Sequence, residues 1–353
     1  MNNIFNKVHN HYNQNLPFVV YAKPNSTDLI AFLQQDKQLH TTNIFNEKGF
    51  VFADFESKKT LVFREQDCEI HKATIDEKVI LNFQEEVDVS VDGKANFESL
   101  VQKGIQFIQD GNFQKVVVSR KESLKKDNFD WETVFQKLLK AYPSAFRYCW
   151  FHPEIGMWMG ATPEQLLKVE NSRFKTVALA GTQKYNPLAE AVWLAKERQE
   201  QQFVTDFILK SIESEVVSMD QTAPYTFRAG NLIHLKTDIE GIFKSDFNLK
   251  KVIELLHPTP AVCGLPKQAS KAFILKEEGY ERKFYSGFLG ELNKNFSENR
   301  EGDTDLFVNL RCMEIQQNNI NLYIGCGITI DSNPEKEYFE TANKALTMKQ
   351  ILN

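Results

Sequence analysis

The sequence predicts an α+β protein built on large antiparallel sheets. Short apolar runs separated by polar turns follow one another in pairs, as strands of β-hairpins do. Blocks of helical periodicity interrupt these pairs instead of following each strand, which argues against a doubly wound parallel sheet. The chain has 353 residues, of which 42% are hydrophobic and 25% charged. It is therefore long enough for one large core.

Apolar periodicity and turn residues predict the following elements along the chain. Up to residue 143 they are strands at 17–24, 49–57 and 59–65, a helix at 96–110, a strand at 114–124 and a helix at 130–143. Asp130 can cap the second helix and Pro143 can end it. The rest comprises strands at 146–152, 156–162, 164–170 and 175–181, a long helix containing 195–208, a strand at 231–241, helices at 249–256 and 267–278, strands at 284–292, 305–316 and 320–330, and a C-terminal helix over 333–348.

Two of these helices carry the same acidic pair. Glu197 and Glu200 are spaced i, i+3 in the long helix, and Glu337 and Glu340 repeat the spacing in the last one, with Lys344 one turn later. Each pair could be a solvated face with an ordinary ion pair. If the helices faced each other across a cavity, four carboxylates would repel, and a divalent cation would relieve the repulsion. Carboxylate ligands suit Mg²⁺, so the sequence suggests a magnesium site that holds an anionic substrate.

Two further residues are candidates for acid–base chemistry. Lys115 begins a strand beside three valines, and Glu164 follows the turn "GATP". Taken singly, the lysine is expected to extend to the surface and the glutamate to be a turn carboxylate. If both point into a dry cavity, the lysine can act as a base and the glutamate as a buried acid with a raised pKa.

Several strand residues are candidates for ligand contact. Gly181 and Thr182 lie in "LAGTQ", and Gly325 and Gly327 lie in "IGCGI"; glycine in a strand marks either a close approach of a ligand or a bulge. Arg311, predicted in the middle of a strand, suits a substrate carboxylate or an internal ion pair.

Histidines and cysteines give weaker signals. His234 and His257, taken singly, are expected to be core or turn residues. The five cysteines form no CxxC pair, which favours reduced thiols and a cytoplasmic location. The N-terminus lacks the pattern of a secretory signal, and no apolar run is long enough to span a membrane. With a net charge of -5 and no basic tract, nucleic acid is not an expected partner.

Together these segments resemble the chorismate-utilising enzymes, a family that includes isochorismate, salicylate, anthranilate and aminodeoxychorismate synthases. The resemblance covers about residues 97–348 and rests on "KVVVSR", "GATPEQLL", "LAGT", "KERQEQQFV", "LIHLKTDIEG", "HPTPAVCGLPK", "FYSGFLGEL", "VNLRCMEI", "YIGCGIT" and "SNPEKEYFETANK". It implies a single domain with two large, mainly antiparallel sheets packed together and helices outside. Residues 1–95 would be a strand-rich part of that domain, and 96–353 the chorismate-binding catalytic region.

The resemblance also implies roles for particular residues. Glu200 and Glu340 would be direct Mg²⁺ ligands, and Glu197 and Glu337 would hold metal-bound waters. The implied substrate contacts are Arg311, the Gly325 backbone and Lys344 on carboxylates, Gly181, Thr182, Ala261 and Val262 around the ring, Tyr285 at the enolpyruvyl group, and His234. Gln201 departs from the family, which often has histidine there, but this neighbour is not a metal ligand.

The implied activity is that of an isochorismate synthase acting on chorismate. Members that use water as the nucleophile carry a lysine at the position of Lys115, and Glu164 would protonate the departing hydroxyl. Salicylate synthase is the first alternative. An anthranilate or aminodeoxychorismate synthase component would need an amidotransferase partner, which is not expected; a non-catalytic chorismate-binding protein is the last alternative. Whether the pathway leads to menaquinone or a siderophore stays open, as does the oligomeric state.

Overall fold

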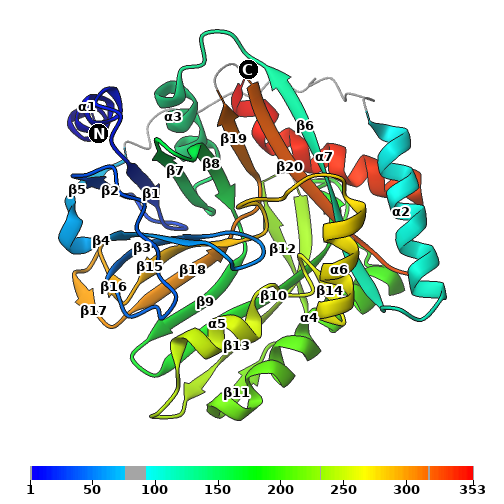
Figure 1. The fold of residues 1–353 in the computed structure, drawn as a ribbon. Coiled ribbons are helices and arrows are strands. Elements are labelled where there is room, and N and C mark those ends of the chain that lie inside the picture. Colours follow the sequence, from blue (N-terminus) through cyan, green and yellow to red (C-terminus); the bar gives the residue numbers. More distant parts are fainter. Residues whose placement is uncertain (1, 76–92, 231, 317–318, 353) are drawn as a thin grey trace.

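Two large sheets organise the computed structural model, which describes residues 2–75, 93–230, 232–316 and 319–352 (Figure 1). All strand pairs in the described residues are antiparallel, as expected. The first sheet has the order β14 (Gly264–Leu265), β6 (Lys115–Lys125), β20 (Asn319–Ile328), β19 (Cys312–Gln316), β8 (Gly156–Thr162), β7 (Phe146–His152), β1 (Phe18–Ala22), β2 (Asp28–Gln34) and β5 (Cys68–Thr74).

The second sheet is of similar size. Its order is β11 (Val216–Gln221), β13 (Leu232–Phe243), β10 (Arg173–Lys184), β9 (Gln165–Glu170), β18 (Thr304–Val308), β15 (Phe288–Leu292), β3 (Gly49–Ala53) and β4 (Thr60–Arg64), while β12 (Tyr225–Ala229) also pairs with β13. A short ribbon joins β16 (Lys294–Asn295) to β17 (Arg300–Glu301).

Aromatic side chains fill the space between the sheets. Trp150 and Trp158 of the first sheet and Phe52 of the second belong to one buried cluster, in which Phe52 stacks on Phe284 with ring centroids 4.3 Å apart. Because successive strand residues face opposite sides, the other face of each sheet is left for helices. In the described residues the apolar core therefore has three layers: the aromatic layer between the two sheets, and one layer between each sheet and the helices that cover it.

Helices cover the outer faces of both sheets. The first sheet packs against α1 (Asn2–Asn13), α3 (Trp131–Ala141) and α7 (Pro334–Leu352), and the second against α4 (Ala195–Ile212) and α5 (Leu249–Leu256). Near β6 and β20 lie α2 (Lys94–Gln109) and α6 (Lys267–Glu277). Two 3-10 turns, Glu65–Asp67 and Glu213–Glu215, complete the described elements. The predicted architecture of two packed sheets with helices outside is confirmed.

One element prediction was wrong. The single strand expected at 305–316 is two strands, β18 and β19, which belong to different sheets. The chain crosses between them at Arg311, whose φ of 46° breaks the extended backbone. The helix α1 at the start of the chain was not predicted; its Ile4, Phe5 and Val8 pack on the first sheet, and the strands β1 to β5 follow it. Its many asparagines, which have low helix propensity, concealed that helical spacing.

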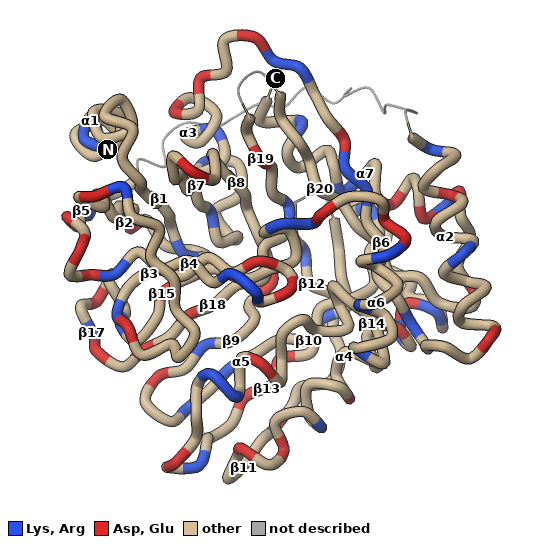
Figure 2. Tube along the Cα trace, in the orientation of Figure 1, with Lys and Arg blue, Asp and Glu red and all other residues tan. Residues whose placement is uncertain are grey.

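The N-terminal region contributes to both sheets. Strands β1, β2 and β5 join the first sheet, and β3 and β4 join the second. Residues 76–92 of the predicted segment 1–95 lie outside the described residues. Figure 2 shows basic and acidic residues interspersed over the trace, with long tan stretches along many strands. Within the described part of the chain, no helix has the length and apolarity needed to cross a membrane.

Candidate active site

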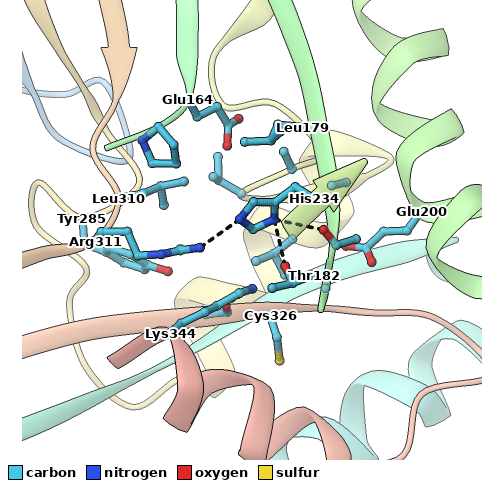
Figure 3. Close-up of a pocket in the computed structure, with 18 residues that line it drawn as sticks. Glu164, Leu179, Thr182, Glu200, His234, Tyr285, Leu310, Arg311, Cys326 and Lys344 are labelled. Atoms are coloured by element: carbon cyan, nitrogen blue, oxygen red, sulfur yellow. Dashed lines mark hydrogen bonds between the residues drawn. The ribbon is translucent and has the colours of Figure 1, made fainter. Parts of the chain in front are cut away.

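One pocket collects the residues expected to contact substrate (Figure 3). Its lining includes Glu164, Glu200 and all nine expected contacts: Gly181, Thr182, His234, Ala261, Val262, Tyr285, Arg311, Gly325 and Lys344. The contributors come from both sheets and from α7, so tertiary structure is needed to assemble the site. The sequence reasoning did not single out the apolar lining residues Val117, Pro163, Leu179 and Leu310, because they resemble ordinary core residues.

Glu164 is a buried carboxyl group between β8 and β9. It is 4% exposed, and the apolar residues Pro163, Leu179 and Leu310 line the pocket with it. Burial raises its pKa to about 7, against the opposing charges of Lys115, Arg311 and Lys344. Glu164 is therefore buried and not an exposed turn carboxylate, and its role as the acid remains a prediction. A carboxyl group that is partly protonated at neutral pH can donate a proton to a bound ligand.

Lys115 points into the interior and not to the surface. Its side chain is fully buried at the start of β6, with Nζ 3.1 Å from Glu200 Oε1. A Cβ at Gly327 would lie 2.0 Å from that same oxygen and 3.1 Å from Lys115 Cε. A side chain at 327 would therefore displace the Glu200 carboxylate, because the ion pair packs directly on the backbone of β20.

Elsewhere in the pocket, two cations and a stretch of backbone without a side chain suit an anionic ligand. Lys344 Nζ donates to Gly325 O at 3.0 Å and to Glu340 Oε1 at 2.7 Å. A Cβ at Gly325 would lie 2.7 Å from Tyr285 Oη, so this glycine lets the phenol reach the strand. Arg311 lines the same pocket from the crossing between the two sheets, where its backbone is left-handed.

His234 is held neutral between the two sheets. Burial, together with the charges of Arg311 and Lys344, lowers its pKa to about 3. Nδ1 lies 3.0 Å from Gly181 O, and Nε2 lies 3.5 Å from Arg311 Nη2. With the proton on Nδ1 donated to Gly181 O, Nε2 accepts from Arg311 and orients it. His257, in contrast, is buried outside the pocket lining, as expected for a core residue.

The four acidic residues of the proposed metal site lie at this pocket and in an adjoining open groove of about 530 Å³. Glu200 lines the pocket, and Glu197, Glu337 and Glu340 line the groove. Three of them have lysine partners: Glu200 with Lys115, Glu340 with Lys344, and Glu337 with Lys196. Glu197 differs, since its Oε2 accepts from Leu194 N–H at the start of α4, at 3.0 Å.

The negative charges of these four glutamates fit a divalent cation bound by oxygen ligands. Burial would lower the pKa of Lys196, but the carboxylates of Glu337, Glu200 and Glu340 hold it above its ordinary value. Burial and the charge of Glu340 raise the pKa of Glu337. As the described side chains stand, no three acidic, histidine or cysteine groups are close enough to share one ion. The donor set of hard oxygens fits Mg²⁺, and the metal roles remain predictions.

The fold and pocket define a two-sheet α+β protein with a buried ligand pocket of mixed charge. Residues 28–353 match the family model described as chorismate binding enzyme. The chain therefore belongs to the chorismate-binding enzymes, as the sequence motifs indicated.

Individual relatives in this family differ in activity. The chain is 30% identical over 277 residues to the salicylate biosynthesis isochorismate synthase of Pseudomonas aeruginosa, covering 75% of this chain and 56% of that protein. It is 28% identical to isochorismate synthase EntC of Escherichia coli K12, covering 73% and 67%, and 26% identical to anthranilate synthase component 1 of Aquifex aeolicus, covering 73% and 53%. The matched region thus spans little more than half of two of these relatives.

A solved structure shares the fold. MenF, the menaquinone-specific isochorismate synthase from Escherichia coli, superposes with a TM-score of 0.77 at 20% identity, covering 96% of this chain and 89% of that one. At this identity the likeness concerns the fold alone.

Proposed function

We propose that this protein is an isochorismate synthase, which converts chorismate to isochorismate with Mg²⁺. The observation that carries the proposal is the pocket-lining Glu164, whose pKa of about 7 suits it to donate a proton. The fully buried Lys115, which would accept the other proton, is joined to the pocket through its contact with the lining residue Glu200. Burial of both groups keeps bulk water from taking over their roles.

The reaction exchanges one hydroxyl group for another on the ring. Water attacks C2 and loses a proton to Lys115 while the ring double bonds shift and the C4 hydroxyl leaves. Glu164 gives its proton to that hydroxyl, so one water enters and one departs. Its raised pKa makes the proton available near neutral pH.

The anionic groups of chorismate match the cations of the pocket. Arg311 and Lys344 supply positive charge, and the Gly325 backbone lies open beside Tyr285. Held by Glu200 and Glu340, with Glu197 and Glu337 behind them, Mg²⁺ would supply charge stabilisation at the ring carboxylate. His234 keeps Arg311 oriented and stays uncharged, so it does not compete for the carboxylate.

A product analysis tests the proposal. Chorismate, Mg²⁺ and ¹⁸O-labelled water should give isochorismate with the label in its C2 hydroxyl, and added ammonium should not be incorporated. Salicylate and pyruvate as main products would instead identify a salicylate synthase. An aminated product would place the chain with its anthranilate synthase relatives, and no turnover would identify a chorismate-binding protein.

A further inference from the structure

Side chains supply hydrogen-bond partners to the outer edge of β6 where its short partner strand, β14, does not reach. Strand β14 has two residues and pairs only with Val116 and Lys115. Next to it, Val117 N–H donates to Cys263 O at 2.8 Å. The following edge groups of β6 meet an ion pair: Val117 O accepts from Arg282 Nη2 at 2.7 Å, and Ser119 N–H donates to Glu278 Oε1 at 2.7 Å. Glu278 and Arg282 thus offer the acceptor and donor that a neighbouring strand would supply.

This ion pair is buried and lies outside the pocket lining. The side chains of Glu278 and Arg282 are 1% and 2% exposed, and Arg282 Nε donates to Glu278 Oε2 at 2.8 Å. Arg282 Nη1 also donates to Val262 O at 2.8 Å. Both carbonyls that it binds, those of Val117 and Val262, belong to pocket-lining residues. One planar guanidinium therefore joins the strand that carries Lys115 to the wall of the pocket.

We propose that Glu278 and Arg282 are positioning residues, whose ion pair fixes the strand of Lys115 relative to the Val262 wall and so sets the distance between Lys115 and the bound ring. The inference rests on the proposed function only for the identity of the reaction. Neither residue lines the pocket, so the effect passes through the backbone at Val117 and Val262 and through the lining residue Tyr285, since the Arg282 guanidinium lies 5.7 Å from the centre of its ring. Misplacing a reacting group by about 1 Å costs on the order of 10²-fold in rate.

Two variants and a matched control test this role. Arg282→Lys keeps the charge but cannot reach Glu278 and both carbonyls at once, and Glu278→Gln keeps the shape but weakens both charge-assisted bonds. The control is Arg147→Lys, since Arg147 is also buried and donates to backbone carbonyls of Ala145, Leu139, Lys23 and Ser26, away from the pocket. Turnover, the chorismate dissociation constant, the unfolding midpoint and amide exchange in 116–120 are measured for each protein.

The expected result separates position from stability. All three variants should have lower unfolding midpoints, but only those at 282 and 278 should exchange faster in 116–120. Arg282→Lys should lower turnover by about 10²-fold while changing the dissociation constant much less. Equal exchange and turnover in Arg282→Lys and Arg147→Lys would overturn the proposal, and Glu278→Gln supplies the same comparison if Arg282→Lys does not fold. A parent protein that makes another product would refute the proposed function, yet exchange and chorismate binding would still test the positioning role.

Discussion

Replacing Glu164 with glutamine should make the protein more stable at alkaline pH while removing activity. The carboxyl group has a pKa of about 7 in the folded protein and 4.5 as its ordinary value, because burial disfavours the charge. Below pH 4.5 the carboxyl group is protonated in both the folded and the unfolded state, so burying it adds no electrostatic cost to folding. Between pH 4.5 and 7 the unfolded chain loses the proton first, so the folded state becomes progressively less favoured. Above pH 7 the cost is constant.

The magnitude follows from the two pKa values. At about 1.4 kcal/mol for each pKa unit, the change from 4.5 to about 7 corresponds to roughly 3 kcal/mol of lost stability above pH 7. The side chain is 4% exposed, so solvent screening removes little of this cost. Glutamine has the same shape and no charge. The free energy of unfolding of Glu164→Gln relative to the parent should therefore rise by roughly 3 kcal/mol from pH 4.5 to pH 8, whatever the difference between the two proteins is at pH 4.5.

Urea unfolding at both pH values measures this difference, with chelator present and chorismate absent so that neither changes the charges. Glu215→Gln is a control of opposite sign, because hydrogen bonds from Lys251 and Ser214 lower the pKa of Glu215. Its stabilising contribution is lost only as the pH falls below 4.5 through the lowered pKa, so the stability of this variant relative to the parent should change little between pH 4.5 and pH 8, and in the opposite direction. If the stability difference for Glu164→Gln is the same at both pH values, Glu164 is not the buried acid that the proposed reaction requires.

Three other perturbations test the site. Glu200→Ala or Glu340→Ala should abolish Mg²⁺-dependent turnover without unfolding the protein, as should chelator added to the parent; activity in excess chelator would contradict the metal site. Lys115→Gln should lower turnover by about 10²- to 10⁴-fold with little change in chorismate affinity, and near-normal turnover would exclude it as the base. Gly327→Ala should inactivate a folded protein, because the new Cβ would lie 2.0 Å from Glu200 Oε1; an active variant would show that the Lys115–Glu200 pair is not needed as placed.

Local patterns in the sequence predicted much of the fold. Hairpin-like apolar runs predicted antiparallel sheets because side chains alternate between strand faces. The assignment failed where sheet membership mattered: residues 305–316 look like one strand, yet β18 and β19 pair with different partners. The sequence does not show that Arg311 has φ of 46°, since this conformation follows from crossing between two sheets.

The sequence by itself predicted Glu164, Glu200 and the nine expected substrate contacts of the pocket, but not its apolar lining, because motifs preserve the order and spacing of residues that a family's fold brings together. Only the tertiary structure decided their environment. The pKa of Glu164 depends on Leu179 and Leu310 around it and on cations from β6, the sheet crossing and α7. The hydrogen bonds of Glu278 and Arg282 to the edge of β6 likewise depend on where β14 ends. Burial, charge and edge pairing are set by neighbours far away in the chain, so no local pattern carries them.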